Sequence, residues 1–101
     1  MNKVLGILGL AKRAGALAIG TNSVLESVRK GKALLVLIAS DASSNTQKQL
    51  TDKASFRHVP VQMLPFDMSE LGHAIGKDHT VAVAITQEGF VISYTKACTA
   101  K

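Results

Sequence analysis

Residues 33–39 read ALLVLIA, an uninterrupted apolar run between Lys32 and Ser40. A run of this length is far shorter than the roughly 20 residues that a membrane-spanning helix needs. Because no polar residue alternates with the apolar ones, the pattern is typical of a strand that is covered on both of its faces. The stretch therefore predicts an α/β protein in which a central strand over residues 34–39 is buried between two layers of helices.

The segments on either side of this run alternate between helical and strand-like patterns. Helices are expected over about residues 2–14, 21–30, 44–56 and 67–75, and strands over residues 16–19, 59–64, 81–86 and 90–94. Pro60 places the strand 59–64 near an edge of the sheet, because proline cannot donate a ladder hydrogen bond. Residues 87–89 (QEG) read as the turn of a hairpin between the last two strands.

The helix ends carry their own signals. Asn2 is expected to cap the first helix, and Gly6 and Gly9 within it are expected to let another element approach closely. Two capping boxes are expected, Ser44 with Gln47 and Asp67 with Glu70. Glycines at residues 15, 31 and 76 are expected stops of three helices.

Composition limits the classes of protein that the chain can belong to. Its 101 residues are the size of one domain, so a single domain over residues 1–101 is expected, and the 47% apolar content indicates a globular core. The single cysteine, Cys98, can form no internal disulfide. Residues 1–10 lack the pattern of a signal peptide, so a cytoplasmic location is expected.

The positive charge is concentrated at the start of the chain. Six cations and one carboxylate lie within residues 1–32, and the remaining residues are neutral in sum, so the net charge of +5 sits in the first third. Such an asymmetry is typical of a surface that faces a polyanion. It also fits a solvated face with cations at helix ends, which the helix dipole favours.

The motifs of common enzymes are incomplete in this chain. Gly31-Lys32 resembles the end of a phosphate-binding loop, but Glu26 stands where that motif needs glycine and Ala33 where it needs Ser or Thr. The three histidines and Cys98 lack the spacing of a metal site. Asp67 and Glu70 are better explained as helix caps than as paired catalytic carboxylates. We therefore expect no enzymatic activity, no cofactor and no metal.

Several motifs in order resemble the ribosomal protein L7Ae family, whose members are related to ribosomal protein L30e. They are RAG (residues 13–15) followed by the IG turn (19–20), the strand that ends in ASDAS (39–43), and LGHAIGKD (71–78). The similarity runs from about residue 8 to residue 90. It implies a three-layer α/β/α sandwich with a mixed central sheet, and a domain that binds kink-turn RNA, in which the turn after the first strand meets tandem sheared G·A pairs.

The resemblance also implies which residues contact RNA. Gly20, Thr21 and Asn22 match the family's pattern in this turn, whereas Ser23 stands where Glu is usual and Glu26 where Lys is usual. A loop before the last-but-one expected strand covers a flipped-out nucleotide in the family, and here it is Lys77, Asp78, His79 and Thr80. Flanking phosphates are expected to meet Lys12, Arg13, Arg29, Lys30 and Lys32.

The resemblance implies a non-catalytic protein that is associated with the ribosome and recognises ribosomal RNA or another structured RNA, with no membrane or DNA partner. The turn also has a purely structural explanation, in which Thr21 or Asn22 caps the helix and Ser23 with Glu26 forms a capping box. One alternative function is a protein-interaction adaptor of the same fold that has lost kink-turn specificity. Another is a detached substrate-binding domain like those preceding RNA methyltransferase domains.

Overall fold

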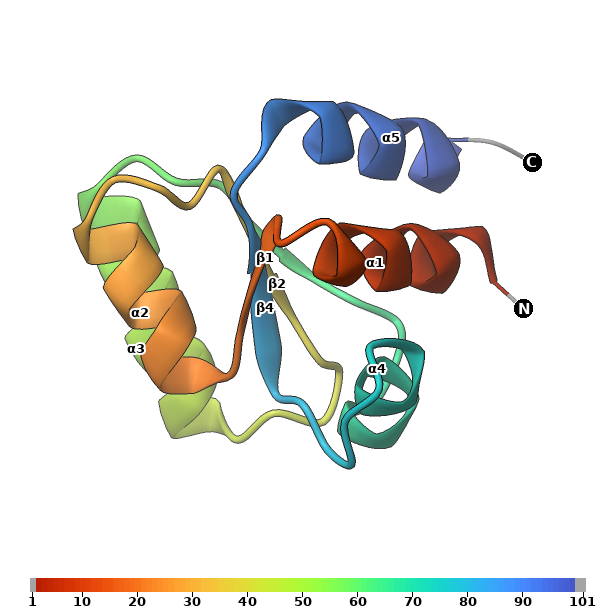
Figure 1. Cartoon of the computed structure of the whole chain (residues 1–101). Helices are drawn as coiled ribbons and strands as arrows, with labels where there is room; N and C mark the ends of the chain where they lie inside the picture. Colours follow the sequence, from red (N-terminus) through yellow and green to blue (C-terminus); the bar gives the residue numbers. More distant parts are fainter. Residues whose placement is uncertain (1, 100–101) are drawn as a thin grey trace.

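The computed structural model describes residues 2–99, which form five helices around one four-stranded sheet (Figure 1). The elements are α1 (Lys3–Arg13), β1 (Leu17–Ile19), α2 (Thr21–Arg29), β2 (Leu35–Ile38), α3 (Ser44–Phe56), β3 (Val61–Met63), α4 (Met68–Ala74), β4 (Ala82–Ile85) and α5 (Glu88–Thr99). Among these residues, no helix is long and apolar enough to span a membrane.

The sheet is mixed, with the strand order β1-β4-β2-β3. Strand β2 runs parallel to β3, whereas β4 runs antiparallel to both of its neighbours, β1 and β2. Strand β3 lies at an edge, as Pro60 predicts. The last strand within residues 2–99, β4, therefore lies in the interior of the sheet, and β1 forms the other edge.

Helices cover both faces of the sheet, with α2 and α3 on one side and α1, α4 and α5 on the other (Figure 1). Along β2, Leu35 and Leu37 join the core beneath α1, α4 and α5, while Val36 and Ile38 join the core beneath α2 and α3. All four residues are buried, because each face of the strand meets helices. The three-layer α/β/α sandwich predicted from the sequence is confirmed.

The end of the chain differs from the expected hairpin. Residues 90–94 belong to α5, so the prediction of a strand there is wrong. Phe90, Val91 and Tyr94 recur at helical spacing and pack with Leu8 of α1 into one core cluster, while Ile92 is exposed. Burial of this face against α1 favours the helix over the strand propensity of the aromatic and β-branched side chains.

Two of the expected helix caps are present and one is displaced. Asn2 accepts a hydrogen bond from the Val4 amide, and Asp67 with Glu70 forms a complete capping box. The Ser44–Gln47 box is wrong, because Ser43 is the N-cap of α3 and its hydroxyl accepts from the amide of residue 46. The Gln47 side chain instead donates to the carbonyl of Ala42 at 2.7 Å, and Ala42 is the residue before the N-cap of α3.

Helices α1 to α4 are each followed by a left-handed residue, and its own amide and that of the next residue donate to carbonyls of the last helical turns. In α3 this residue is His58, with φ 61°, and the amides of His58 and Val59 donate to Ser55 and Ala54. At the ends of the other three helices the residue is glycine, as expected from the sequence. At the end of α3, His58 therefore adopts a left-handed conformation that is unfavourable for a residue with a Cβ atom.

Close approach of another element is confirmed at Gly9 and is wrong at Gly6. A Cβ atom on Gly9 would lie 2.9 Å from the Ala74 carbonyl oxygen, whereas a Cβ on Gly6 would meet nothing within 4 Å. Helix α4 therefore packs against α1 at Gly9, and this contact fixes where α4 and the loop after it lie beside the sheet.

Candidate nucleic-acid interface

The turn between β1 and α2, here called the Gly20 turn (residues 20–23), is built around a glycine in a left-handed region. Gly20 has φ 93° and ψ 158°, a conformation that residues with a Cβ avoid. Its amide donates to the Ala82 carbonyl at 2.9 Å, and its carbonyl accepts from the Val24 amide at 2.9 Å. One residue therefore extends the β1–β4 pairing and also begins α2.

The first turn of α2 has no side-chain cap. Gly20 occupies the N-cap position, and within residues 2–99 no side chain makes a cap hydrogen bond to this helix. The structural explanation of the turn, in which Thr21 or Asn22 caps the helix, is therefore wrong. Asn22 and Ser23 are exposed. The helix thus presents its first amides, which carry partial positive charge, beside two exposed polar side chains.

Glu26 lies one turn further along α2 than Asn22, and its carboxylate pairs with cations near the C-terminus of the helix. Within residues 2–99, the expected capping box of Ser23 with Glu26 is therefore not formed. The Glu26 carboxylate accepts a hydrogen bond from the Arg29 guanidinium and lies 3.4 Å from the Lys30 ammonium. The bond from Arg29, followed by the charges of both cations, holds the pKa of the Glu26 carboxyl below its usual value. Glu26 therefore neutralises part of the charge at this end of α2.

The loop of residues 77–80 lies at the same end of β4 as the Gly20 turn, because it leads into the start of β4, where the Gly20 amide bonds to Ala82. Lys77, Asp78 and His79 are exposed, whereas Thr80 is only 3% exposed and its amide donates to the Met68 carbonyl at 3.1 Å. A Cβ on Gly72 would lie 2.5 Å from the Asp78 carbonyl oxygen, so α4 packs directly on the loop backbone. The loop is thus held at both ends, with three side chains directed to solvent.

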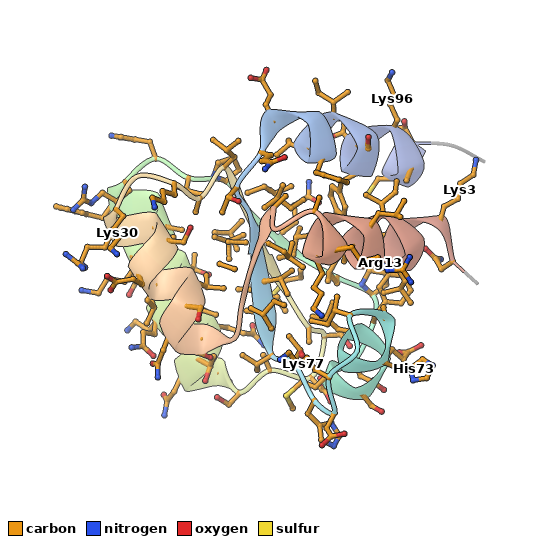
Figure 2. All side chains as sticks on the ribbon, in the orientation of Figure 1. Lys3, Arg13, Lys30, His73, Lys77 and Lys96 are labelled. Carbon is orange, nitrogen blue, oxygen red and sulfur yellow. The ribbon has the colours of Figure 1, made fainter. Side chains whose placement is uncertain are left out.

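The cations of the first third do not form one cluster. Arg29, Lys30 and Lys32 lie at or just beyond the C-terminus of α2, about 13 Å from the Gly20 turn for a helix of nine residues. Lys12 and Arg13 lie at the other side of the molecule, where they line a hollow with His73 of α4. Figure 2 shows Lys30 and Arg13 on opposite sides of the sheet, with Lys77 at its lower edge.

A groove follows the edge strand β1 from the Gly20 turn to the cluster at the C-terminus of α2. It is lined by Asn22 and Ser23 at one end and by Lys30 and Lys32 at the other, and its volume is about 530 Å³. The hydroxyl of Ser27 is buried in its wall and has no hydrogen-bond partner among the described residues. The groove connects the uncapped helix start to two exposed ammonium groups.

One surface feature was not indicated by the sequence. Phe56, at the end of α3, is 78% exposed and faces a groove between α2 and α3 that also contains Lys53 and Arg57. In the sequence, the available signal is a lone aromatic residue at the end of a mostly polar helix. That signal does not reveal that α2 lies alongside.

Comparisons with known proteins agree with this architecture. The family model described as "Ribosomal protein L7Ae/L30e/S12e/Gadd45 family" matches residues 2–93. The RNA-binding protein YlxQ of Bacillus subtilis is 43% identical over 84 residues, covering 83% of each chain. The large ribosomal subunit protein eL30 of Archaeoglobus fulgidus is 32% identical over 89 residues, covering 87% of this chain and 99% of that protein.

The fold is also found among solved structures. A Bacillus halodurans protein of unknown function superposes with a TM-score of 0.90 at 34% identity, covering 99% of this chain and all of that one. The resemblance seen in the RAG, ASDAS and LGHAIGKD motifs is thus confirmed over nearly the whole length. The chain belongs to the ribosomal protein L7Ae/L30e/S12e/Gadd45 family.

Proposed function

We propose that the protein binds structured RNA of the kink-turn or internal-loop kind through the Gly20 turn and the N-terminus of α2. The observation that carries the proposal is the 2.9 Å hydrogen bond from the Gly20 amide to the Ala82 carbonyl, because it joins this turn to the strand that follows the 77–80 loop. These are the two segments that the family resemblance predicts to contact RNA. The two relatives, an RNA-binding protein and a ribosomal protein, support RNA as the ligand and the ribosome as its setting.

The chemistry of the Gly20 turn suits a purine next to a phosphate. An exposed Asn22 amide can donate to and accept from one base edge at the same time. The uncapped amides at the start of α2 can donate to an anionic oxygen, and the missing Cβ at Gly20 lets a base or phosphate approach the backbone. Within residues 2–99, no side chain caps the start of α2, so its first backbone amides are available as hydrogen-bond donors to a ligand.

The cations can act on two flanks of the same RNA. Lys30 and Lys32 lie at the far end of the β1 groove and can meet phosphates that run along it from the Gly20 turn. Lys12 and Arg13 lie across the sheet, near the loop that carries Lys77. Such contacts position RNA without reading its sequence, so the sequence preference has to come from the Gly20 turn.

Titration of a kink-turn duplex with the natural protein and with Asn22→Ala tests this function. Loss of a base contact is expected to weaken binding by about 1 to 3 kcal/mol. The melting temperature is expected to stay the same, because Asn22 caps no helix in this fold. Gln87→Ala is the matched control, since it removes another exposed amide side chain from the opposite end of β4.

A second duplex, with the sheared G·A pairs replaced by Watson–Crick pairs, measures specificity. Weaker binding to this duplex is expected only if the Gly20 turn reads the kinked geometry. Glu26→Lys is expected to tighten binding to the kink-turn duplex, because it places the family's usual cation beside the Gly20 turn and frees Arg29 and Lys30. If neither the natural protein nor Glu26→Lys binds the kink-turn, the adaptor function takes precedence.

The dependence on salt gives a separate measure of the phosphate contacts. Each phosphate contacted contributes about 0.7 to 0.9 to the slope of the logarithm of affinity against the logarithm of salt concentration. Replacing Lys30 and Lys32 together by Gln is expected to flatten this slope. An unchanged slope in a folded variant would assign these two lysines to solubility.

A further inference from the structure

Phe56 is exposed in a protein that has few aromatic residues and buries the others wholly or in part. The chain has three Phe, one Tyr and no Trp. Phe66, Phe90 and Tyr94 belong to the core or pack against it, whereas Phe56 is 78% exposed and is the most exposed large apolar side chain in residues 2–99. Leaving a Phe ring in water forfeits the stabilisation that its burial would contribute. The core therefore does not explain this side chain.

The ring faces a groove between α2 and α3 that we call the stacking groove. It is lined by Asn22, Leu25 and Arg29 from α2, and by Lys53, Phe56 and Arg57 from the end of α3. Its volume of about 510 Å³ lies within the range of small-molecule sites. The groove is therefore large enough to admit a planar base.

The charge of the stacking groove is positive. Arg29, Lys53 and Arg57 line it, and the Arg57 guanidinium carbon lies 6.0 Å from the centre of the Phe56 ring. Glu26 is the one carboxylate among the lining residues of this groove, and it is already paired with Arg29 and Lys30. Two cations of α3 therefore remain beside an exposed aromatic face.

The backbone holds this arrangement in place. His58 has φ 61°, and the amides of His58 and Val59 donate to Ser55 and Ala54 at 3.0 and 2.8 Å. These bonds end α3 directly after Phe56 and Arg57, so both side chains project from a fixed last turn. A side chain on a fixed backbone has less conformational freedom to lose when a ligand stacks on it than one on a flexible loop.

We propose that the stacking groove binds an unpaired nucleotide of the RNA, with its base stacked on Phe56 and its phosphate on Lys53 and Arg57. An aromatic face beside cations is the chemistry that recognises single-stranded nucleic acid without sequence preference. Asn22 belongs both to this groove and to the Gly20 turn, so one RNA can occupy both. The inference rests on the proposed RNA-binding function and adds a second, single-stranded subsite to it.

Two RNAs separate this inference from the proposed function. One is a blunt kink-turn duplex, and the other carries a short unpaired extension at the end that approaches α2. The extension is expected to tighten binding about 5- to 150-fold, the range for stacking one base on an aromatic side chain. Phe56→Ala is expected to abolish this gain while leaving the affinity for the blunt duplex unchanged.

Three further variants serve as controls. Leu10→Ala removes another exposed apolar side chain, 55% exposed on α1, and is expected to leave the gain intact. Lys53→Gln with Arg57→Gln is expected to reduce the gain and its salt dependence. Phe56→Trp is expected to keep the gain, and because the chain has no Trp, its fluorescence reports stacking directly. Quenching by the extended RNA and not by the blunt duplex is the expected result.

The outcomes distinguish the two proposals. If neither RNA binds, the proposed function fails, and the stacking groove fails with it. If the blunt duplex binds but the extension adds no affinity, or adds the same amount in Phe56→Ala, only the stacking groove is refuted. If oligo-glutamate quenches Phe56→Trp as strongly as the extended RNA does, the groove is instead a site for an acidic protein segment.

Discussion

Replacing Gly72 with Ala tests whether α4 holds the 77–80 loop in place. The added Cβ would lie 2.5 Å from the Asp78 carbonyl oxygen, 2.8 Å from the Asp78 carbonyl carbon and 3.1 Å from the His79 Cα. Ordinary contacts of a Cβ begin near 3.4 Å, so the loop backbone would have to move by about 1 Å. These neighbours are backbone atoms, which cannot rotate away as the end of a side chain can.

The magnitude follows from two opposing effects. Ala in place of Gly inside a helix contributes about 1 kcal/mol of stability. Overpacking costs about 1 to 3 kcal/mol. Displacing the loop also strains the bonds from Lys77 to the Gly72 carbonyl and from Thr80 to the Met68 carbonyl, each worth about 1 kcal/mol. We expect a net loss of about 1 to 3 kcal/mol in the free energy of unfolding.

Thermal and urea denaturation measure this loss, with Gly6→Ala as the matched control. Both glycines lie inside helices, but a Cβ on Gly6 would meet nothing within 4 Å. Gly6→Ala is therefore expected to raise stability by about 0.5 to 1 kcal/mol. Under the proposed function, Gly72→Ala also weakens binding of the kink-turn duplex. If Gly72→Ala is as stabilising as Gly6→Ala, the packing of α4 on the loop described above is wrong.

Three further predictions concern single side chains. His58→Gly is expected to stabilise the fold by about 1 kcal/mol, seen as a melting temperature about 4 to 8 °C higher, because φ 61° strains a residue with a Cβ; a lower melting temperature would contradict this. Ser27→Ala is expected to raise the free energy of unfolding in urea by about 1 kcal/mol, since it removes a buried hydroxyl that has no partner among residues 2–99, and a loss would indicate a hidden hydrogen bond. Burial raises the pKa of Tyr94 above its usual value of about 10, so the folded state holds this proton more tightly and stability falls as the pH rises beyond about 10. Tyr94→Phe is expected to flatten that fall, and phenolate absorbance that titrates near pH 10 in the folded protein would refute it.

The layered fold could be predicted because its signals are local. The apolar run at residues 33–39 has no polar face, and this is the pattern of a strand covered on both sides. The Asp67–Glu70 capping box involves residues three apart, so it needs no knowledge of the rest of the chain. The same holds for the glycines that follow helices α1, α2 and α4, since each marks a left-handed residue by its identity alone.

The features that were missed depend on contacts between distant segments. Residues 90–94 have strand propensity, and only the packing of Phe90 and Tyr94 against α1 makes them helical. The division of the cations is another such feature, because Arg13 and Lys30 are near in sequence but are separated by the sheet (Figure 2). Phe56 gives the same lesson, since its groove exists only because α2 lies beside α3.

The position of β4 in the sheet determines when, during synthesis, the Gly20 turn can reach its folded conformation. This strand lies between β1 and β2, although within residues 2–99 it is the last strand to be synthesised. Until residues 82–85 emerge from the ribosome, β1 has no strand to pair with among the described residues, and the Gly20 amide lacks the Ala82 carbonyl that fixes it. Pairings between such distant segments form slowly compared with local ones. A nascent chain that has released only its first 80 residues therefore holds Asn22 and His79 on separate, unpaired segments, and the edge that we propose to bind RNA is assembled only after β4 has emerged.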